Sequence, residues 1–271
     1  MENIEKILQW NMGSWDGEPN GQVLDVLEAL IEKHEPSLVA LQEFPENGTA
    51  RVLESAGYNV RYHTERRRKM SGFSDVWSLD ETRISEHYSG ILLVLEHLEL
   101  SIKLNFWNVH FQAKAPERKR RSEIRNFATN YVKTSRQDPW YEVVVGDFNF
   151  EPFEESLADI DGFGANRCYT WVRRSNAKTP PGARLLLNRA WSLMAVENQQ
   201  PGSFYKSDIP GGPWLVFDQV LVSCTLQSET LPAPELITSV GNYDLKSQRA
   251  DKPSEPGSDH FPICTSIYLK I

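Results

Sequence analysis

Cysteine is scarce in this chain, and Cys168, Cys224 and Cys264 are far apart. An odd number at these spacings excludes a disulfide framework and the closely spaced pairs of a zinc site. We therefore expect three buried free thiols, which suits a reducing cytosol, and we predict a cytoplasmic protein. The opening residues, MENIEKILQW, also lack the basic and apolar regions of a secretory signal.

Long hydrophobic runs and an excess of positive charge are missing too. The longest apolar stretch, ILLVL at 91–95, is followed by Glu96 and is too short for a membrane span. The formal net charge of −8 excludes a basic field over the whole protein, so any nucleic acid must bind a local basic patch. We predict no membrane association and no obligate protein partner.

What is present is typical of a globular protein. The 271 residues are 40% hydrophobic and 24% charged, with no linker, repeat or low-complexity segment. We predict one domain, residues 1–271, with a mixed sheet arrangement and helices outside it. Periodicity predicts strands at 4–10, 37–42, 58–62, 90–96, 100–111, 140–149, 214–223 and 261–270, helices at 22–33, 46–56 and 116–133, a polar loop at 63–89, and a loop-rich stretch at 151–213 with turns at 180–182 and 210–212.

Polar residues of catalytic types stand at or near the ends of the apolar strands. They are Asn11, Glu43, His110, Asp147, Asn149, Asp218, Asp259 and His260. Strand ends meet at one edge of a sheet, where loops can bring their side chains together. The pattern predicts one site made of carboxylates, carboxamides and two imidazoles.

Such a set suits hydrolysis of a phosphoester. Glu43 can supply a carboxylate to Mg²⁺, which needs only one or two from the protein. Asp147 or a histidine can orient and deprotonate a water molecule. Asn11, Asn149 and a protonated His260 can donate to the developing negative charge. Asp218 can fix the tautomer of an imidazole.

Each residue also has a structural interpretation. Asn11 can be a turn residue, Glu43 a solvated carboxylate, and His110 a hydrogen-bonded core histidine. The sequence GDFN at 146–149 can form a plain Asx turn. Asp218 is the hardest to explain in this way, because it interrupts the apolar run WLVFDQVLVS and would be costly to bury without a partner.

The same residues, in order, form motifs. They are Trp10-Asn11, Gln42-Glu43, Asn108-Val109-His110, Gly146-Asp147-Phe148-Asn149, Phe217-Asp218-Gln219-Val220 and Ser258-Asp259-His260. The set resembles the motifs of the endonuclease/exonuclease/phosphatase superfamily, which includes DNase I-like nucleases, abasic-site endonucleases, deadenylases, neutral sphingomyelinases and inositol polyphosphate 5-phosphatases. The resemblance spans nearly the whole chain and implies a four-layer α/β sandwich of two packed mixed β-sheets flanked by helices.

The resemblance also implies a Mg²⁺ or Mn²⁺ cofactor and in-line attack by water on a phosphoester. Glu43 resembles the main metal ligand, with Asn11 beside it and Asp259 near the metal. Asp147 resembles the residue that orients or activates water, and Asn149 a phosphate donor. His260, held by Asp218, resembles the general acid/base or the transition-state stabiliser, and His110 a second phosphate-contacting histidine.

One position departs from the abasic-site branch, whose members usually carry an aspartate two residues after the first asparagine. Here that residue is Gly13. Asp16 is near in sequence, but we assign it no role. The histidine of the NVH motif is usual in the DNase I and phosphodiesterase branches, whereas the abasic-site branch tends to use tyrosine there.

Two basic clusters and two tryptophans bear on the substrate. The clusters are Arg66–Lys69 and Arg118–Arg121, from which we select Arg120 and Arg121 as candidates to bind a nucleic-acid backbone. Trp171 beside Arg173 can stack a base and hold a phosphate, and Trp214 can line the same pocket. The structural alternatives are a solvated loop, a solvated helix face and two core tryptophans.

We therefore predict a Mg²⁺- or Mn²⁺-dependent nuclease acting on DNA or RNA. The alternatives are a phosphodiesterase or phosphatase acting on nucleotides or small molecules, and an inactive binding module with the same fold. The sequence contains no amphipathic membrane-binding stretch, which argues against a lipid substrate. The motifs also lack the neighbours usual in inositol 5-phosphatases.

Overall fold

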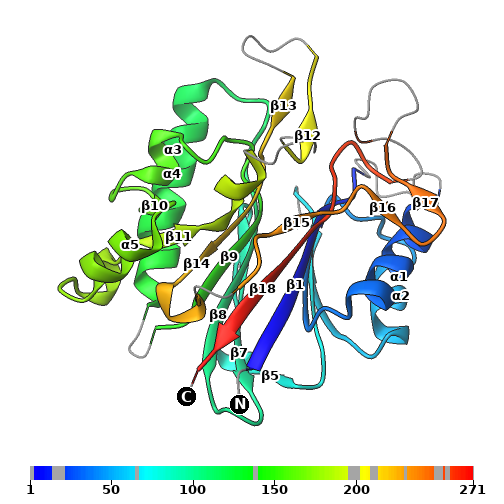
Figure 1. Cartoon of the computed structure of the whole chain (residues 1–271), viewed down its shortest axis with the longest axis horizontal. Coiled ribbons are helices and arrows are strands. Elements are labelled where there is room, and N and C mark those ends of the chain that lie inside the picture. Colours follow the sequence, from blue (N-terminus) through cyan, green and yellow to red (C-terminus); the bar gives the residue numbers. More distant parts are fainter. Residues whose placement is uncertain are drawn as a thin grey trace.

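Two mixed β-sheets form the centre of the computed structural model, which describes residues 3–13, 22–64, 67–136, 140–194, 202–207, 213–228, 231–246, 253 and 257–270 (Figure 1). The first sheet has the order β15-β18-β1-β2-β4-β3, in which β1 and β2 are parallel and the other neighbours antiparallel. Its strands are β1 (Asn3–Asn11), β2 (Leu38–Gln42), β3 (Asn59–His63), β4 (Lys69–Phe73), β15 (Glu235–Leu236) and β18 (Ile263–Leu269).

The second sheet has the order β10-β11-β14-β9-β8-β7-β5, with β6 also paired to β7. Parallel pairing joins β8 to β9 and β10 to β11. Its strands are β5 (Trp77–Leu79), β6 (Ser85–His87), β7 (Gly90–His97), β8 (Lys103–His110), β9 (Glu142–Asp147), β10 (Ala165–Asn166), β11 (Leu186–Asn188) and β14 (Asp218–Val222). Two small antiparallel pairs stand apart, β12 (Phe204–Tyr205) with β13 (Trp214–Leu215) and β16 (Ser239–Val240) with β17 (Tyr243–Asp244).

Helices cover the outer faces of both sheets (Figure 1). Helices α1 and α2 lie on the side of the first sheet, and α3 and α4 on the side of the second. Helical bounds are α1 (Val23–His34), α2 (Thr49–Ser55), α3 (Glu117–Phe127), α4 (Glu155–Ala158), α5 (Tyr169–Asn176), the π-helical turn Ala128–Val132, and the 3₁₀ turns Glu81–Arg83, Lys133–Ser135, Pro181–Ala183, η5 (Arg189–Met194) and η6 (Cys224–Leu226).

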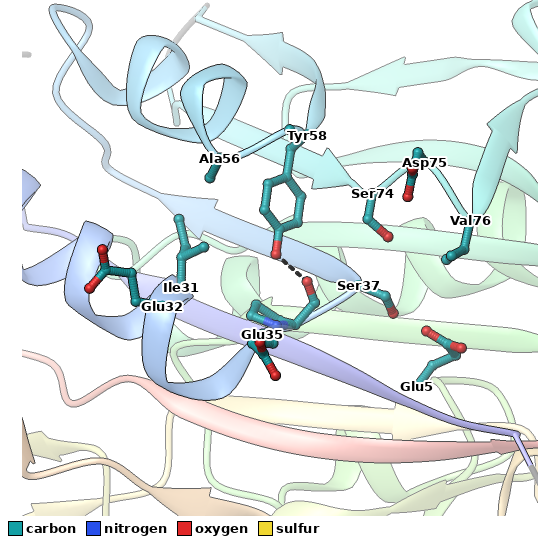
Figure 2. A pocket seen from close by; sticks show the side chains of 12 residues that line it. Glu5, Ile31, Glu32, Glu35, Ser37, Ala56, Tyr58, Ser74, Asp75 and Val76 are labelled. Atoms are coloured by element: carbon teal, nitrogen blue, oxygen red, sulfur yellow. Dashed lines mark hydrogen bonds between the residues drawn. The ribbon is translucent and has the colours of Figure 1, made fainter.

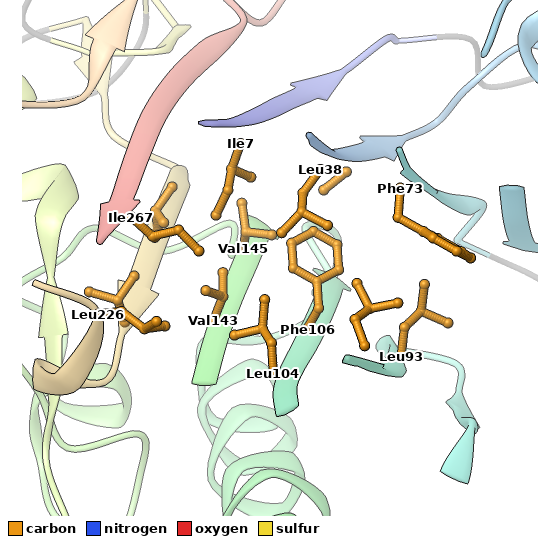
Figure 3. Close-up of a cluster of buried hydrophobic side chains, with 14 of the residues drawn as sticks. Ile7, Leu38, Phe73, Leu93, Leu104, Phe106, Val143, Val145, Leu226 and Ile267 are labelled. Carbon is orange, nitrogen blue, oxygen red and sulfur yellow. The ribbon is translucent and has the colours of Figure 1, made fainter. Parts of the chain in front are cut away.

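Alternation along the strands divides the apolar side chains between three buried layers. Ile7 and Phe106 point into the layer between the sheets, shown in Figure 3. Their neighbour Leu8 points to the layer under α1 and α2, and Trp107 to the layer under α3 and α4. The structure thus confirms the predicted four-layer sandwich.

The predicted polar loop at 63–89 is wrong, because this stretch supplies β4, β5 and β6. Strand β4 lies between β2 and β3, and all five of its residues are buried. The hydropathy pattern did not predict β4, because its sequence, KMSGF, contains the polar residues Lys69 and Ser71. Lys69 is fully buried, and its Nζ donates to the carbonyls of Arg67 and Tyr88.

Three smaller expectations also need correction. The loop-rich stretch 151–213 contains helices α4 and α5. The strand predicted at 214–223 is two strands, so Asp218 begins β14 and does not interrupt an apolar strand. Only Cys264 is buried, whereas Cys168, just before α5, is exposed.

The turn at 210–212 lies outside the described residues. No helix in the described part of the chain is long and apolar enough to cross a membrane.

The close approach of β8 and β9 depends on Gly146, which has φ of +145°. A Cβ there would lie 1.9 Å from the carbonyl oxygen of Val109. We expect Gly146→Ala to lower the free energy of unfolding by at least about 3 kcal/mol in urea titrations. The control Gly182→Ala, whose Cβ would meet nothing nearer than Lys133 O at 3.7 Å, should change it by less than about 1 kcal/mol. Equal midpoints for the two variants would contradict this account.

Candidate active site

Strand register brings the predicted polar residues into two facing rows. In the second sheet, His110 is the register partner of Asp147, and Asp147 is the partner of Asp218. In the first sheet, Asn11 is the partner of Gln42, which immediately precedes Glu43. Both rows lie at the end of the sandwich where β12 and β13 project, opposite the two chain termini in Figure 1. The predicted convergence of strand ends is therefore seen, with contributions from both sheets.

Asp147 is the centre of this cluster. Its Oδ2 accepts hydrogen bonds from Nδ2 of Asn11 at 3.0 Å and from Nδ2 of Asn149 at 2.9 Å. Its Oδ1 accepts from the backbone N of Asn149 at 2.8 Å. The Asn149 side chain also donates to Phe111 O at 3.0 Å. These bonds fix the direction of a carboxylate that is almost completely buried.

His260 and Asp218 form a buried pair. The distance between His260 Nδ1 and Asp218 Oδ2 is 2.7 Å, and the other carboxylate oxygen accepts from Gln9 Nε2 at 2.7 Å. The loop before the last strand is held as well, since Trp10 Nε1 donates to His260 O at 3.1 Å. A hydrogen bond on Nδ1 leaves Nε2 as the nitrogen that can exchange a proton with a substrate.

Glu43 and His110 meet at the other side of Asp147. His110 Nε2 lies 3.4 Å from Glu43 Oε1 and 3.7 Å from Asp147 Oδ2. Glu43 and Asn149 both have positive φ, 46° and 52°, which is uncommon for residues other than glycine. Such backbone strain occurs preferentially at functional sites.

A chain of buried carboxamides beneath the site escaped the sequence interpretation. Gln9 Nε2 donates to Gln42 Oε1 at 2.9 Å, and Gln42 Nε2 donates to Asn108 Oδ1 at 2.7 Å. Asn108 Nδ2 then donates to Met70 O at 2.8 Å. These bonds cross repeatedly between the sheets and end on Asp218. The available signal was Gln9 itself, which stands two residues before Asn11 and shares its strand face.

Negative charge predominates among the ionisable groups. Four carboxylates, those of Glu43, Asp147, Asp218 and Asp259, interact electrostatically with the imidazole of His260. Burial and the neighbouring charge of Asp147 raise the pKa of Glu43 to about 8, and burial raises the pKa of Asp147 to about 7. Burial alone would lower the pKa of His260, but the charge and hydrogen bond of Asp218 raise it to about 10.

The two buried carboxylates Glu43 and Asp147 therefore need a positive partner to be ionised together. Burial, with the charges of Lys69 and Arg67, holds the pKa of His110 well below its usual value, so this imidazole is neutral. No group of three histidine, cysteine or acidic side chains within the described ranges is arranged to hold a metal alone. Mg²⁺ does not require one, because it is bound through one or two carboxylates, waters and substrate phosphate. The donor set fits such an ion.

Asp259 is exposed beside Gly13, the position at which the chain departs from the abasic-site pattern. A Cβ on Gly13 would lie 2.8 Å from Ser258 Oγ and 3.1 Å from Asp259 Oδ1, and its φ is +66°. A side chain at this position would crowd the Ser258-Asp259-His260 loop, and a carboxylate would also repel Asp259. Asp16 lies outside the described residues.

The two arginines chosen on α3 differ. Arg120 reaches the site loop, where its Nη1 lies 3.3 Å from Asn149 O and its guanidinium lies 4.2 Å from the ring centre of Phe150. Arg121 is paired with Glu117, Glu154 and Glu155. Its charge is already matched, so the prediction that it binds substrate is not supported.

Trp171 and Arg173 lie away from the site. They belong to α5, which contacts β11 and η6, next to the Val222 end of β14. Asp218 is at the opposite end of that strand. Trp171 is exposed and not a core residue, and the guanidinium of Arg173 lies 5.6 Å from the ring centre of Tyr169. The structure therefore does not bring either residue to the strand-end rows, and their predicted contact with the substrate has no support from this arrangement.

Trp214 is near the site but packs within a cluster of rings. It stacks on Phe261, the residue after His260, with ring centres 6.1 Å apart. In the first basic cluster, Arg67 pairs with Glu123 and Arg68 lies 3.6 Å from Glu46, while Arg66 is outside the described residues. Two of the four residues of this cluster, Arg67 and Arg68, are thus paired with carboxylates.

A pocket of about 630 Å³ opens at the opposite end of the first sheet (Figure 2). Its lining includes Glu5 at the start of β1, Ser37 just before β2, and Tyr58 just before β3. None of the predicted site residues lines it. The chemistry-bearing side chains are instead concentrated where the strand-end rows meet.

Comparisons with known proteins agree with this architecture. No family model matches the sequence, and neither does any curated protein. Among solved structures, an endonuclease/exonuclease/phosphatase family protein from Bacteroides thetaiotaomicron has a TM-score of 0.67 and 14% identity over 100% of both chains. ANGEL2, described as a 2′,3′-cyclic phosphatase and solved with adenosine-2′,3′-vanadate, has a TM-score of 0.67 and 16% identity over 100% of this chain and 97% of that one.

An AP endonuclease from Archaeoglobus fulgidus has a TM-score of 0.60 and 14% identity over 98% of both chains. These matches extend over essentially the whole chain, as the motif resemblance does. The identities are too low to transfer a substrate. The chain therefore has the fold of the endonuclease/exonuclease/phosphatase family.

Proposed function

We propose that this protein is a metal-dependent phosphoester hydrolase and, more specifically, a nuclease that cleaves phosphodiester bonds. The observation that carries the proposal is the grouping around Asp147, which is held by Asn11 and Asn149 beside the His260–Asp218 pair. This arrangement joins a fixed proton acceptor, hydrogen-bond donors and a charged imidazole in one site.

Each side chain of the site has a distinct role in the proposed reaction. Asp147 accepts a proton from the attacking water and sets its direction. His260, kept protonated by Asp218, donates from Nε2 to the phosphate oxygens as negative charge develops. Asn149, whose side-chain amide already donates to Asp147 Oδ2 and Phe111 O, holds Asp147 in place and does not donate to the phosphate. Glu43 and Asn11 would hold Mg²⁺ or Mn²⁺, with Asp259 nearby. When bound, the ion stabilises charge on the phosphate and leaving oxygen.

Nucleic acid is favoured as substrate by Arg120, which lies beside the site loop. Arg120 contacts the backbone of Asn149, so its charge lies where a phosphate backbone would pass. Relatives in fold include an AP endonuclease and a cyclic phosphatase that binds an adenosine ligand. A nucleotide or small-molecule phosphoesterase is the second candidate, favoured by the net charge of −8 and the pairing of Arg121.

The test is a screen of single- and double-stranded DNA, RNA, nucleotides and phosphoinositides with Mg²⁺ or Mn²⁺. Cleavage of a polynucleotide supports the nuclease, and turnover of nucleotides alone supports the second candidate. No turnover of any phosphoester would support an inactive binding module and reject the proposal. The complete set of polar site residues argues against that third outcome.

The two neighbouring arginines give a matched comparison for substrate length. We expect Arg120→Ala to raise KM for a polynucleotide and to reduce the salt dependence of log KM by about one phosphate contact. Arg121→Ala removes an equal charge that is already neutralised by three glutamates, so its salt slope should match the wild type. Identical slopes for both variants would argue for a small substrate.

A further inference from the structure

Ser203 joins three segments that meet at the Asp218–His260 pair. It is fully buried, and its Oγ accepts a hydrogen bond from the backbone N of Asp218 at 3.2 Å. Its carbonyl accepts from Phe261 N at 2.8 Å, and its own N donates to Leu215 O at 3.0 Å. One residue thus ties down the start of β14 and the residue after His260.

Phe204, the next residue, lies against the imidazole itself. Its backbone forms an antiparallel bridge with His260, and the two ring centres are 4.6 Å apart with an interplanar angle of 34°. Phe217 lies against Phe204 in turn, with ring centres 5.4 Å apart and planes 16° from parallel. The ring that touches His260 is therefore itself fixed by a second ring.

The close approach of this segment depends on Gly202. A Cβ there would lie 2.6 Å from Leu215 O, so a larger residue would push the strand outward. A histidine ring rotates broadly about its second side-chain torsion, and one hydrogen bond on Nδ1 does not fix that rotation. An aromatic ring against its face removes the remaining freedom.

We infer that Ser203 and Phe204 are positioning residues for the Asp218–His260 pair. Ser203 holds the backbone of the carboxylate, and Phe204 holds the plane of the imidazole, so that Nε2 points to the reacting phosphate. The inference rests on the proposed function of the same site. It adds two residues that do not contact substrate and act only through the pair.

Tyr205 is the matched control on the same short strand. Its ring packs against Trp214, with ring centres 5.2 Å apart in a T-shaped arrangement. Tyr205→Ala therefore removes a ring of similar size without removing the contact with His260. Phe204→Tyr keeps the ring and serves as the conservative rescue.

The test combines kinetics with a measurement that does not need activity. We expect Phe204→Ala to lower kcat about 10²-fold with little change in KM, because a small misplacement of a catalytic group costs about this much. Phe204→Tyr should restore kcat, and Tyr205→Ala should keep it. Ser203→Ala should also lower kcat, because it removes the hydrogen bond to the backbone N of Asp218.

In the metal-free protein, the proton between His260 Nδ1 and Asp218 should give a protected downfield proton resonance, assigned by its loss in His260→Gln. It should broaden in Phe204→Ala and persist in Tyr205→Ala and Phe204→Tyr. The inference would be overturned if Phe204→Ala kept both the resonance and the kcat, as Tyr205→Ala is expected to do. It would also be overturned if the two variants lost the resonance and kcat to the same extent. If the wild type hydrolyses no phosphoester, the proposed function fails, while the resonance still tests the positioning.

Discussion

His260→Gln is expected to lower kcat for phosphoester hydrolysis about 10³-fold, because it removes the only charged imidazole of the site and its proton. Asp218→Asn should have a similar effect, since it removes the charge that keeps His260 protonated. The two residues act as a unit. The double variant should therefore be no slower than the slower single variant by more than a few-fold.

The control for this series is His97→Gln. His97 is also buried and also faces a carboxylate, with its Nε2 3.4 Å from Glu5 Oε1, but it ends β7 far from the strand-end rows. Its kcat should equal that of the wild type. Circular dichroism melting curves would show that each variant is folded. Wild-type turnover in folded His260→Gln would remove this histidine from the mechanism.

Chelation is expected to abolish turnover in the wild type, and Mg²⁺ or Mn²⁺ should restore it. Glu43→Gln should weaken Mn²⁺ binding about 10²-fold or more, since it removes the carboxylate charge while keeping nearly the same shape. The physical reason is the buried pair Glu43 and Asp147, whose joint ionisation needs a cation. Mn²⁺ titrations followed by electron paramagnetic resonance measure the binding without reference to activity.

Glu5→Gln provides the control, because it changes a glutamate at the other end of β1. Its Mn²⁺ affinity should match the wild type. Undiminished turnover in excess chelator would exclude the proposed metal dependence. Unchanged Mn²⁺ affinity in Glu43→Gln would instead move the ion to other ligands while leaving the metal requirement intact.

The sequence alone determined the sandwich and most members of the central cluster. Apolar runs with helical and strand periods located the main elements, and several of the strands begin or end at a residue of the cluster. Parallel pairing of β1 with β2 and of β8 with β9 then placed these ends together, as the strand-end argument required. The motifs were informative because the ends of neighbouring strands lie close together at one edge of a sheet.

Only the tertiary structure decided which charged and aromatic residues lie beside the strand-end cluster. Arg120 and Arg121 are neighbours in sequence, yet one contacts Asn149 and the other is bound by three glutamates. Trp171 looked suitable but lies on α5, at the wrong end of β14. Conversely, Ser203 and Phe204 carry no sequence signal of their own. Their roles depend on contacts with residues more than a dozen positions away, and local periodicity holds no information about such contacts.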